Sequence, residues 1–365
     1  MTHPTASADD APALSSRDRE ILRDTISAFI LRGEPVSSRL VAKMSRESLS
    51  SATIRNVMAD LEDSGLLTQP HTSAGRIPTA AGYHLYIDAL MPSLGLDSDE
   101  QRRIDELLAD ETDDAETMMV SASQLLSDLS HQIGIVLTPD VGETRLQSIN
   151  FVQLTGAKVL CVLVSTGGFV DHKVIETPRE HSREELIRIS NYLTDNFTGR
   201  TMREVRDRLL EAMSEERAKV DRLLANAIEL AERALVDRPE PELLVQGTAT
   251  VLDLPELADL ERVRRLLDTF SDHASLVQLL NRLIEGSGVR VLIGGDSELT
   301  SDLDFSLVAK TYGGDDGGRG TVAIFGPSRM QYHKVIPLVD YFGERLSLAL
   351  EKAFTGSWPF EEVNR

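Results

Sequence analysis

The sequence predicts an α+β protein, with a helical N-terminal region followed by a larger region of strands and helices. Apolar residues recur at helical spacing between residues 16 and 64, and a short hairpin pattern bounded by Pro follows them. Beyond residue 130, strand-like apolar runs lie on both sides of a segment with helical periodicity. With 365 residues, of which 41% are hydrophobic, the chain is long enough for two or three globular domains.

Three helices are predicted in the N-terminal region, after a polar tail at residues 1–14 that we expect to be disordered. Ser16 caps the first predicted helix, and a shorter second helix follows after a turn. The third helix is capped by Ser51 or Ser50, whose hydroxyl accepts a hydrogen bond from an otherwise unpaired amide, and Gly65 ends it.

Residues 66–79 predict a β-hairpin. Pro70 and Pro78 bound two short strands, and a polar turn lies between them. A further helix completes a domain that we place at residues 15–92. Three helices followed by a hairpin is the order of a winged helix-turn-helix, in which the third helix enters the major groove of DNA.

The remainder of the chain predicts a sheet domain interrupted by a helix-rich insertion. We assign residues 98–179 and 273–358 to the sheet domain and residues 180–272 to the insertion. Within the insertion, residues 201–236 contain neither Gly nor Pro and carry an apolar stripe. A helix of this length extends about 54 Å, so we expect it to pack against a partner instead of a compact core. Strand-like runs occur at residues 134–137, 146–153, 158–164, 170–176, 243–251, 289–293, 305–312 and 321–325.

The net charge of −21 is unevenly distributed along the chain. Residues 15–90 contain nine Lys or Arg and nine Asp or Glu, so the N-terminal region is neutral and the acidic excess lies elsewhere. Phosphate neutralisation supplies most non-specific affinity for DNA. One such neutral region therefore binds DNA only weakly by itself.

Polar side chains at the start of the third helix predict contacts to base edges. Arg bonds guanine through two atoms, Asn does the same to adenine, and hydroxyls reach bases or phosphates. The hairpin tip adds small or basic groups suited to a phosphate or a minor groove. Periodicity alone fits equally well a three-helix module that binds protein, with these side chains solvated. The predicted DNA-binding residues are Ser50, Ser51, Thr53, Arg55 and Asn56 on the helix and His71, Thr72, Ser73 and Arg76 on the hairpin.

Several blocks of sequence together resemble one protein family. The most specific is QPHTSAGRIPT at Gln69–Thr79, preceded by the block Ser50–Gly65. Further matches are GGFVDHKV at 167–174, IGG at 293–295, FGPSRMQY at 325–332 and VIPLVD at 335–340. These blocks resemble the HrcA family of heat-inducible transcription repressors of bacterial chaperone operons, from residue 14 to residue 357. One departure is Asp296-Ser297, where the family usually has Glu-Asn.

The resemblance implies a winged-helix domain, a GAF-like α/β domain and a dimerisation domain inserted into the latter. It also implies a homodimer that binds double-stranded DNA at an inverted-repeat operator called CIRCE, released on heat stress, and help from the GroEL chaperonin. GAF-like domains often hold a small ligand, so a ligand-sensing transcription regulator is the alternative function. A metabolite that binds the folded state would raise its thermal stability, which separates the two.

No other pattern predicts a chemical site, and we expect no enzyme activity, cofactor or metal. The run Gly313–Gly320 lacks the Lys-Ser/Thr ending of a phosphate-binding loop. The carboxylates between Asp296 and Asp304 have Ser301 where a calcium-binding EF-hand loop needs glycine. Cys161 is the single cysteine and falls in an apolar run, so we expect a buried side chain and no internal disulfide.

We also expect a cytoplasmic protein that does not associate with membranes. The longest unbroken apolar run, Val159–Val164, is much shorter than the roughly 20 residues that cross a bilayer. The first residues are polar and acidic and do not have the apolar segment of a secretory signal.

Overall fold

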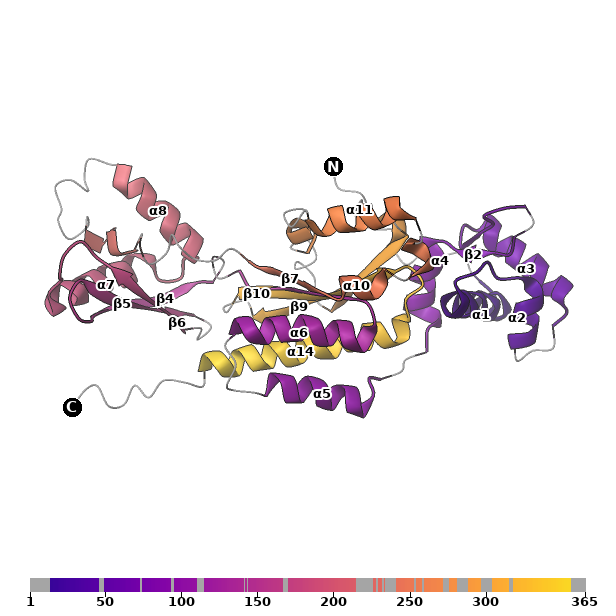
Figure 1. Ribbon diagram of the computed structural model, residues 1–365, viewed down its shortest axis with the longest axis horizontal. Helices are drawn as coiled ribbons and strands as arrows, with labels where there is room; N and C mark the ends of the chain where they lie inside the picture. Colours follow the sequence, from indigo (N-terminus) through magenta and orange to yellow (C-terminus); the bar gives the residue numbers. More distant parts are fainter. Residues whose placement is uncertain are drawn as a thin grey trace.

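The computed structural model shows three parts arranged in a row (Figure 1). The N-terminal helices lie at one end, a five-stranded sheet lies in the middle, and a three-stranded sheet with its own helices lies at the other end. This is the mixed α+β architecture that the sequence predicts. The structure describes residues 14–45, 49–72, 74–92, 95–109, 115–140, 142, 144–166, 170–214, 226–227, 229–231, 233, 241–252, 254–257, 259–271, 276–280, 288–296, 304–314 and 318–355.

The N-terminal part, called the head below (residues 15–90), begins with the three predicted helices. They are α1 (Ser16–Arg32), α2 (Ser38–Met44) and α3 (Ser51–Asp63). The cap of α1 is Ser15 and not the predicted Ser16, and it forms a capping box with Asp18. Gly33 ends α1 with a left-handed φ of 70°. The apolar faces of the three helices share one core, in which Ile26 and Leu61 are buried.

A hairpin completes the head and is paired to the segment between α1 and α2. The elements after α3 are β1 (Leu67–Thr68), β2 (Ile77–Pro78), α4 (Ala80–Leu85) and a π-helical turn η2 (Tyr86–Leu90). Val36 and Arg76 exchange two backbone hydrogen bonds, each of 2.8 Å between nitrogen and oxygen. Gly75 permits this approach, because a Cβ there would lie 2.4 Å from the carbonyl oxygen of Val36.

The middle part, called the central domain, is built on one antiparallel sheet in the order β7-β3-β10-β9-β8. Its strands are β3 (Ile133–Leu137), β7 (Leu243–Gln246), β8 (Val289–Ile293), β9 (Phe305–Gly314) and β10 (Gly318–Pro327). Alternate residues of a strand point to opposite faces. Val322 and Ile324 therefore pack into one core, and Ala323 and Phe325 pack into a second core on the other side.

Helices cover both faces of this central sheet (Figure 1). One face carries α5 (Ser98–Leu108), α6 (Ala115–Ser130) and α14 (Tyr332–Thr355). The other face carries α10 (Thr248–Val251), the 3-10 helix η5 (Pro255–Leu257) and α11 (Leu260–Ser271). Phe325 lies between two rings on this second face, with centroids 5.0 Å from Phe305 and 5.3 Å from Phe270 of α11.

The third part, called the insert (residues 144–233), has its own sheet and its own core. The strands β4 (Leu146–Gln153), β5 (Lys158–Ser165) and β6 (Val170–Glu176) pair in the order β4-β5-β6. Helices α7 (Arg183–Phe197) and α8 (Met202–Ser214) contribute to one core with this sheet. The Ser190 hydroxyl of α7 accepts a hydrogen bond of 3.0 Å from the Phe151 amide. Helix α7 thereby also protects the free edge of β4.

The structure moves both boundaries that we expected for the insertion. Residues 146–176 were expected to extend the central sheet, but they form the separate three-stranded sheet. Conversely, β7 and α11 were expected in the insertion at 180–272, and they belong to the central sheet and its second core. The insert is therefore an α+β unit instead of a helix-rich one, because the chain leaves the central sheet after β3 and returns to it at β7.

The apolar stripe of residues 201–236 is buried within the insert where the structure describes it. Val205 and Leu209 of α8 and Ala227 and Ala231 all belong to the core of the insert. Residues 215–225 lie outside the described residues, so the prediction of one long helix over residues 201–236 stays a prediction. The described part of the stripe is therefore covered inside one chain and is not the outward seam that we expected.

Candidate nucleic-acid interface

The two faces of α3 have opposite characters. The inner face is buried through Ile54, Val57, Met58 and Leu61. On the outer face, Ser51, Arg55 and Asn56 are exposed. Ser50 caps the helix, because its hydroxyl accepts a hydrogen bond of 3.1 Å from the Thr53 amide. The first two turns of α3 thus present polar side chains from a helix whose orientation is fixed by its buried face.

The tip of the hairpin is held by Gln69, which follows β1. Its side-chain amide donates to the carbonyl oxygens of Thr72 (3.1 Å) and Ala74 (2.9 Å). The Ala74 amide donates to the carbonyl of His71 at 2.8 Å. His71 and Thr72 are exposed, and the predicted residue Ser73 lies outside the described residues. The tip is therefore an ordered turn with two of the predicted side chains on its surface.

Arg76 has a different environment from that expected of a hairpin-tip cation. Its guanidinium lies 2.8 Å from the carboxylate of Glu62, near the end of α3, and the two side chains are 19% and 31% exposed. Its backbone N–H and C=O groups both form hydrogen bonds with Val36. In the free protein Arg76 therefore braces the hairpin against α3.

Predicted residues from α3 and from the hairpin meet in one hollow of about 450 Å³. Arg55 of α3 and Thr72 of the hairpin tip line it, and so do Arg76 and Gln69. The start of α2 contributes Ser37 and Ser38. Side chains far apart in the sequence thus form one continuous polar surface.

Two exposed cations of α2 were missed by the sequence analysis. Arg39 and Lys43 lie one turn apart, on the side of α2 opposite to the buried Val41. Within the described part of the chain, no carboxylate lies within ion-pair distance of either side chain or of Arg55. By contrast, Arg23 of α1 lies 3.0 Å from the carboxylate of Asp24. The spacing of four residues between Arg39 and Lys43 could have predicted this cationic face of α2.

The other sites weighed in the sequence do not form a metal centre among the described residues. No group of three or more His, Cys, Asp or Glu is placed there to hold a metal ion. Cys161 is buried in β5. The described helices include none with the length and apolar content that crossing a bilayer requires.

The glycine run and the acidic loop have structural roles where they are described. Gly313 and Gly318 adopt positive φ at the connection between β9 and β10. The carboxylate of Asp296 accepts a hydrogen bond of 2.8 Å from the Ile293 amide. Glu298 and Asp302 lie outside the described residues.

Known proteins similar to this chain match it over nearly its whole length. The chain is 41% identical over 338 residues to the heat-inducible transcription repressor HrcA of Geobacter sulfurreducens, covering 93% of this chain and 98% of that protein. It is 37% identical over 348 residues to the protein of the same name from Xanthomonas euvesicatoria, covering 95% and 99%. A crystal structure of a hypothetical protein aligns with a TM-score of 0.55 at 26% identity, covering 93% of this chain and 98% of that one.

Because relatives named transcription repressors share nearly the whole chain, its class is that of a transcription repressor. The family model of the HrcA protein C-terminal domain matches residues 116–336, which span most of the central domain and the insert. The chain belongs to the HrcA family.

Proposed function

We propose that the head is a winged helix-turn-helix that binds double-stranded DNA and that the protein represses the transcription of heat-shock genes. The observation that carries the proposal is the polar outer face of α3, where Arg55 and Asn56 are exposed beside the hairpin tip. Helix α3 then enters the major groove, and α2 crosses the DNA backbone. Family membership supports this function, because the relatives are named heat-inducible transcription repressors.

Different parts of the head contact bases and phosphates in this proposal. Arg55 and Asn56 read base edges, since their side chains form two-atom pairs with guanine and adenine. Arg39 and Lys43 contact phosphates, which position the protein without reading sequence. Arg76 acts mainly by holding the hairpin in place through Glu62. The hydroxyl and imidazole groups that reach bases or phosphates are Ser50, Ser51, Thr53, His71, Thr72 and Ser73.

The insert supplies the homodimer interface in this proposal. One face of its sheet packs on α7, while the opposite face carries Val152, Leu160 and Val174 in one cross-strand row. Val152 and Val174 are 50% and 51% exposed, and Leu160 is half-buried. An uncovered apolar face of this kind is typical of a protein–protein interface. A second copy of the chain fits it, because an inverted repeat mirrors the two-fold symmetry of its reader.

The operator in this proposal is the CIRCE inverted repeat, and the central domain is the GAF-like domain of the family. Ligand sensing, the alternative function, would use a pocket between the sheet and its covering helices. On the α11 side, Phe270, Phe305 and Phe325 fill this space as a packed cluster. A small effector would have to displace these rings, so the structure favours the repressor without an effector.

Heating ends repression in this proposal by loss of the active dimer. The insert joins the central domain through only two crossings of the chain, so it opens locally at modest cost. A neutral head alone has little hold on phosphates, and affinity for the operator falls steeply once the two heads are no longer linked. GroEL returns the inactive protein to the active dimer, and clients that occupy GroEL during stress leave the repressor inactive.

The substitution Arg55→Ala tests the proposal. We expect it to reduce affinity for the operator by about 1–3 kcal/mol and to relax specificity at one base pair of each half-site, because one two-atom base contact is lost. The measurement is fluorescence anisotropy of a labelled inverted repeat taken from upstream of a chaperonin gene. Arg102→Ala removes an Arg of α5 that is 65% exposed and serves as the matched control. Unchanged binding by Arg55→Ala, or an equal loss on operator and random DNA, would contradict the base-reading role.

A further inference from the structure

Two sequence blocks of the central domain have no role in the DNA contacts proposed above. They are residues 293–296, from the last residue of β8 onward, and residues 325–332, from the end of β10 to the first residue of α14. Both lie at the end of the central sheet that meets α4 of the head (Figure 1). We propose that these blocks form a socket that fixes the orientation of the head, and that Tyr83 and His84, held in the socket, are positioning residues for operator recognition.

The first contact in the socket joins two aromatic rings. Tyr83 of α4 and Tyr332 of α14 are both buried, with ring centroids 5.7 Å apart. The Tyr332 hydroxyl is held by the side chain of Ser306 (2.9 Å) and the carbonyl of Ser328 (2.8 Å). Burial, together with the neighbouring Tyr332, raises the pKa of the Tyr83 phenol well above its ordinary value, so this group stays neutral. The head therefore inserts a neutral aromatic side chain between the two parts.

The second contact is a guanidinium placed against the end of α1. Arg329 pairs with Glu256 of η5 through two hydrogen bonds, and the two side chains are 20% and 17% exposed. A Cβ on Gly33 would lie 3.1 Å from Nε of Arg329. The cation thus lies directly against the C-terminal end of α1, where the helix dipole favours positive charge.

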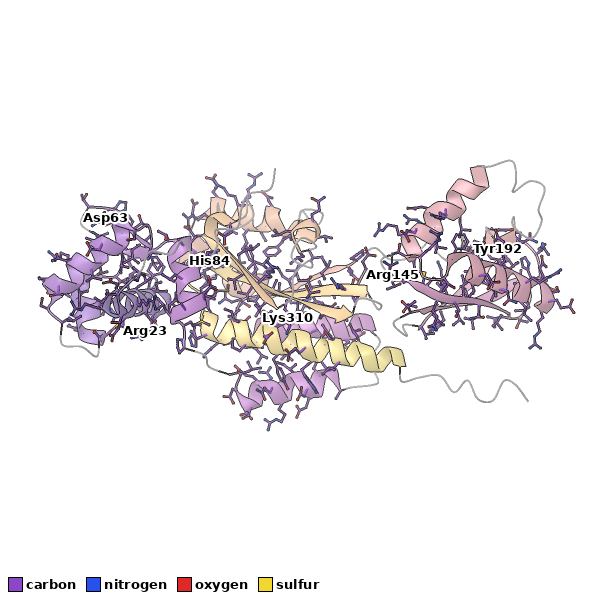
Figure 2. The ribbon with its side chains drawn as sticks, turned by 180° about the vertical axis from the view of Figure 1, so that it is seen from behind. Arg23, Asp63, His84, Arg145, Tyr192 and Lys310 are labelled. Carbon is purple, nitrogen blue, oxygen red and sulfur yellow. The ribbon has the colours of Figure 1, made fainter. Side chains whose placement is uncertain are left out.

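The third contact is polar and lies at the rim of the socket. Nε2 of His84 is 2.7 Å from Oδ2 of Asp296, and the two side chains are 39% and 28% exposed. The same carboxylate oxygen accepts the Ile293 amide at 2.8 Å, which fixes its direction. Figure 2 shows His84 where the head meets the central domain.

Together the contacts hold the head at two separated places, the end of α1 and helix α4. A head joined by its linker alone would reorient freely, which is the usual state of domains with small shared surfaces. In a dimer, the orientation of each head sets the distance between the two α3 helices. The socket therefore determines which spacing between half-sites the protein accepts. This inference rests on the proposed DNA-binding function.

The substitution His84→Ala tests the inference, because it removes the rim contact and leaves the buried ring in place. We expect affinity for a single half-site to stay within about twofold of the wild type, while affinity for the full operator falls about tenfold. Operators with a longer or shorter spacer should lose little further affinity, so the preference for the native spacing shrinks. Asp88→Ala, on the next turn of the same helical segment, is exposed and should behave as wild type. Tyr83→Phe keeps the ring and should also retain the spacing preference.

An unchanged spacing preference in His84→Ala would overturn the inference. A loss of half-site affinity would also overturn it, because His84 would then act within the head or at the DNA. A measurement without DNA separates this inference from the proposed function. A dye on Asp63→Cys, at the outer end of α3, should report one slow rotation of the whole molecule, and His84→Ala should add a faster component. Cys161 is buried and does not compete for the dye. If the wild type binds no DNA at all, the DNA-binding proposal fails, and the dye still decides whether the socket holds the head.

Discussion

The head and the insert leave different kinds of surface uncovered. On the head, Arg39, Lys43 and Arg55 are exposed cations with no carboxylate partner among the described residues. On the insert, Val152 and Val174 form part of an apolar sheet face. The first surface suits phosphates, and the second suits a protein partner. Because the two lie at opposite ends of the molecule (Figure 1), the proposed dimer contact is connected to the proposed DNA contact only through the central domain.

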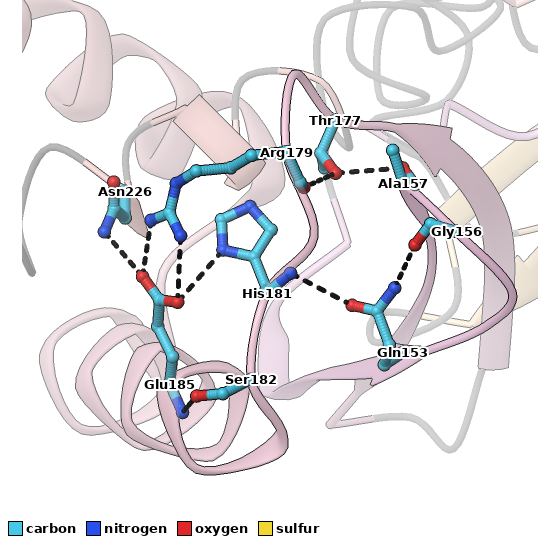
Figure 3. A network of polar contacts seen from close by, with 9 residues as sticks. All are labelled: Gln153, Gly156, Ala157, Thr177, Arg179, His181, Ser182, Glu185 and Asn226. Carbon is cyan, nitrogen blue, oxygen red and sulfur yellow. Dashed lines mark hydrogen bonds and ion pairs between the residues drawn. The ribbon is translucent and has the colours of Figure 1, made fainter.

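The interiors of the two parts also differ. The core of the head is apolar, with its polar caps at the surface. The insert also contains a polar cluster centred on Glu185 (Figure 3). Arg179 donates to both carboxylate oxygens of Glu185 at 2.6 and 3.2 Å, and Asn226 donates at 2.7 Å. The ring of the buried His181 lies 3.4 Å from the same carboxylate. Glu185 thus has three polar partners in the insert, whereas the Arg76–Glu62 ion pair of the head joins only two side chains.

The largest effect in this comparison is expected from a charge on the apolar face of the insert. Val174→Asp should leave the chain folded, because the side chain is 51% exposed, but should dissociate the dimer. Operator affinity should then fall at least about 100-fold, since the two heads no longer bind as a linked pair. Light scattering after gel filtration and operator anisotropy measure the two results.

Ile187→Asp is the matched control for this substitution. Ile187 lies on α7 of the same insert and is 48% exposed, so the two substitutions introduce the same charge at side chains of similar exposure. We expect this variant to remain a dimer. Dissociation by Ile187→Asp with an intact Val174→Asp dimer would place the interface on α7 and reverse the assignment of the two faces.

A smaller effect is expected from the polar cluster, and it should appear in the insert only. Glu185→Gln removes the charge that Arg179 and Asn226 bind, and should lower the free energy of unfolding at neutral pH by about 1–3 kcal/mol. Urea unfolding with probes in the head and in the insert measures it. Glu184→Gln, which removes the adjacent exposed carboxylate, is the control. Equal destabilisation by both variants would mean that the cluster has no special role.

The same cluster predicts a pH dependence. The hydrogen bonds from Arg179 hold the pKa of the Glu185 carboxyl below its ordinary value. A carboxyl whose pKa is lower in the folded state stabilises the protein above its unfolded pKa, and this contribution disappears as the pH falls through the folded value. The wild type should therefore lose insert stability on acidification, whereas Glu185→Gln should lose less over the same range.

The head was predictable from the sequence because its signals are local. Ser50 and Gly65 bound α3 through caps that involve only neighbouring residues. The exposure of Arg55 and Asn56 follows from the helical spacing of the buried positions around them. What could not be predicted locally was Arg76, because its partner Glu62 belongs to another element and only the folded hairpin brings the two together.

The insert was harder to delimit because sheet membership is not a local property. Strands β3 and β4 follow each other closely in the chain, yet β3 pairs with β10 and β7 while β4 pairs with β5. Nothing in the composition near Thr144 marks the departure from the central sheet. The pairing of His84 with Asp296 depends on contacts across 212 positions, so no spacing pattern could indicate it.

The smallest predicted effect is that of Lys43→Ala, which tests the phosphate contacts proposed for the head. Removing one phosphate contact should lower the slope of log affinity against log salt by about 0.9 for each half-site. Operator and random DNA should weaken alike, because phosphates carry no sequence information. Arg23→Ala removes the same charge from the head at a side chain already paired with Asp24, and should leave the slope unchanged. If both variants lower the slope equally, the head acts through its net charge and α2 has no defined place on the DNA backbone. If only Lys43→Ala does, the exposed cations of α2 are the phosphate contacts, and Arg55 keeps the separate role of reading bases.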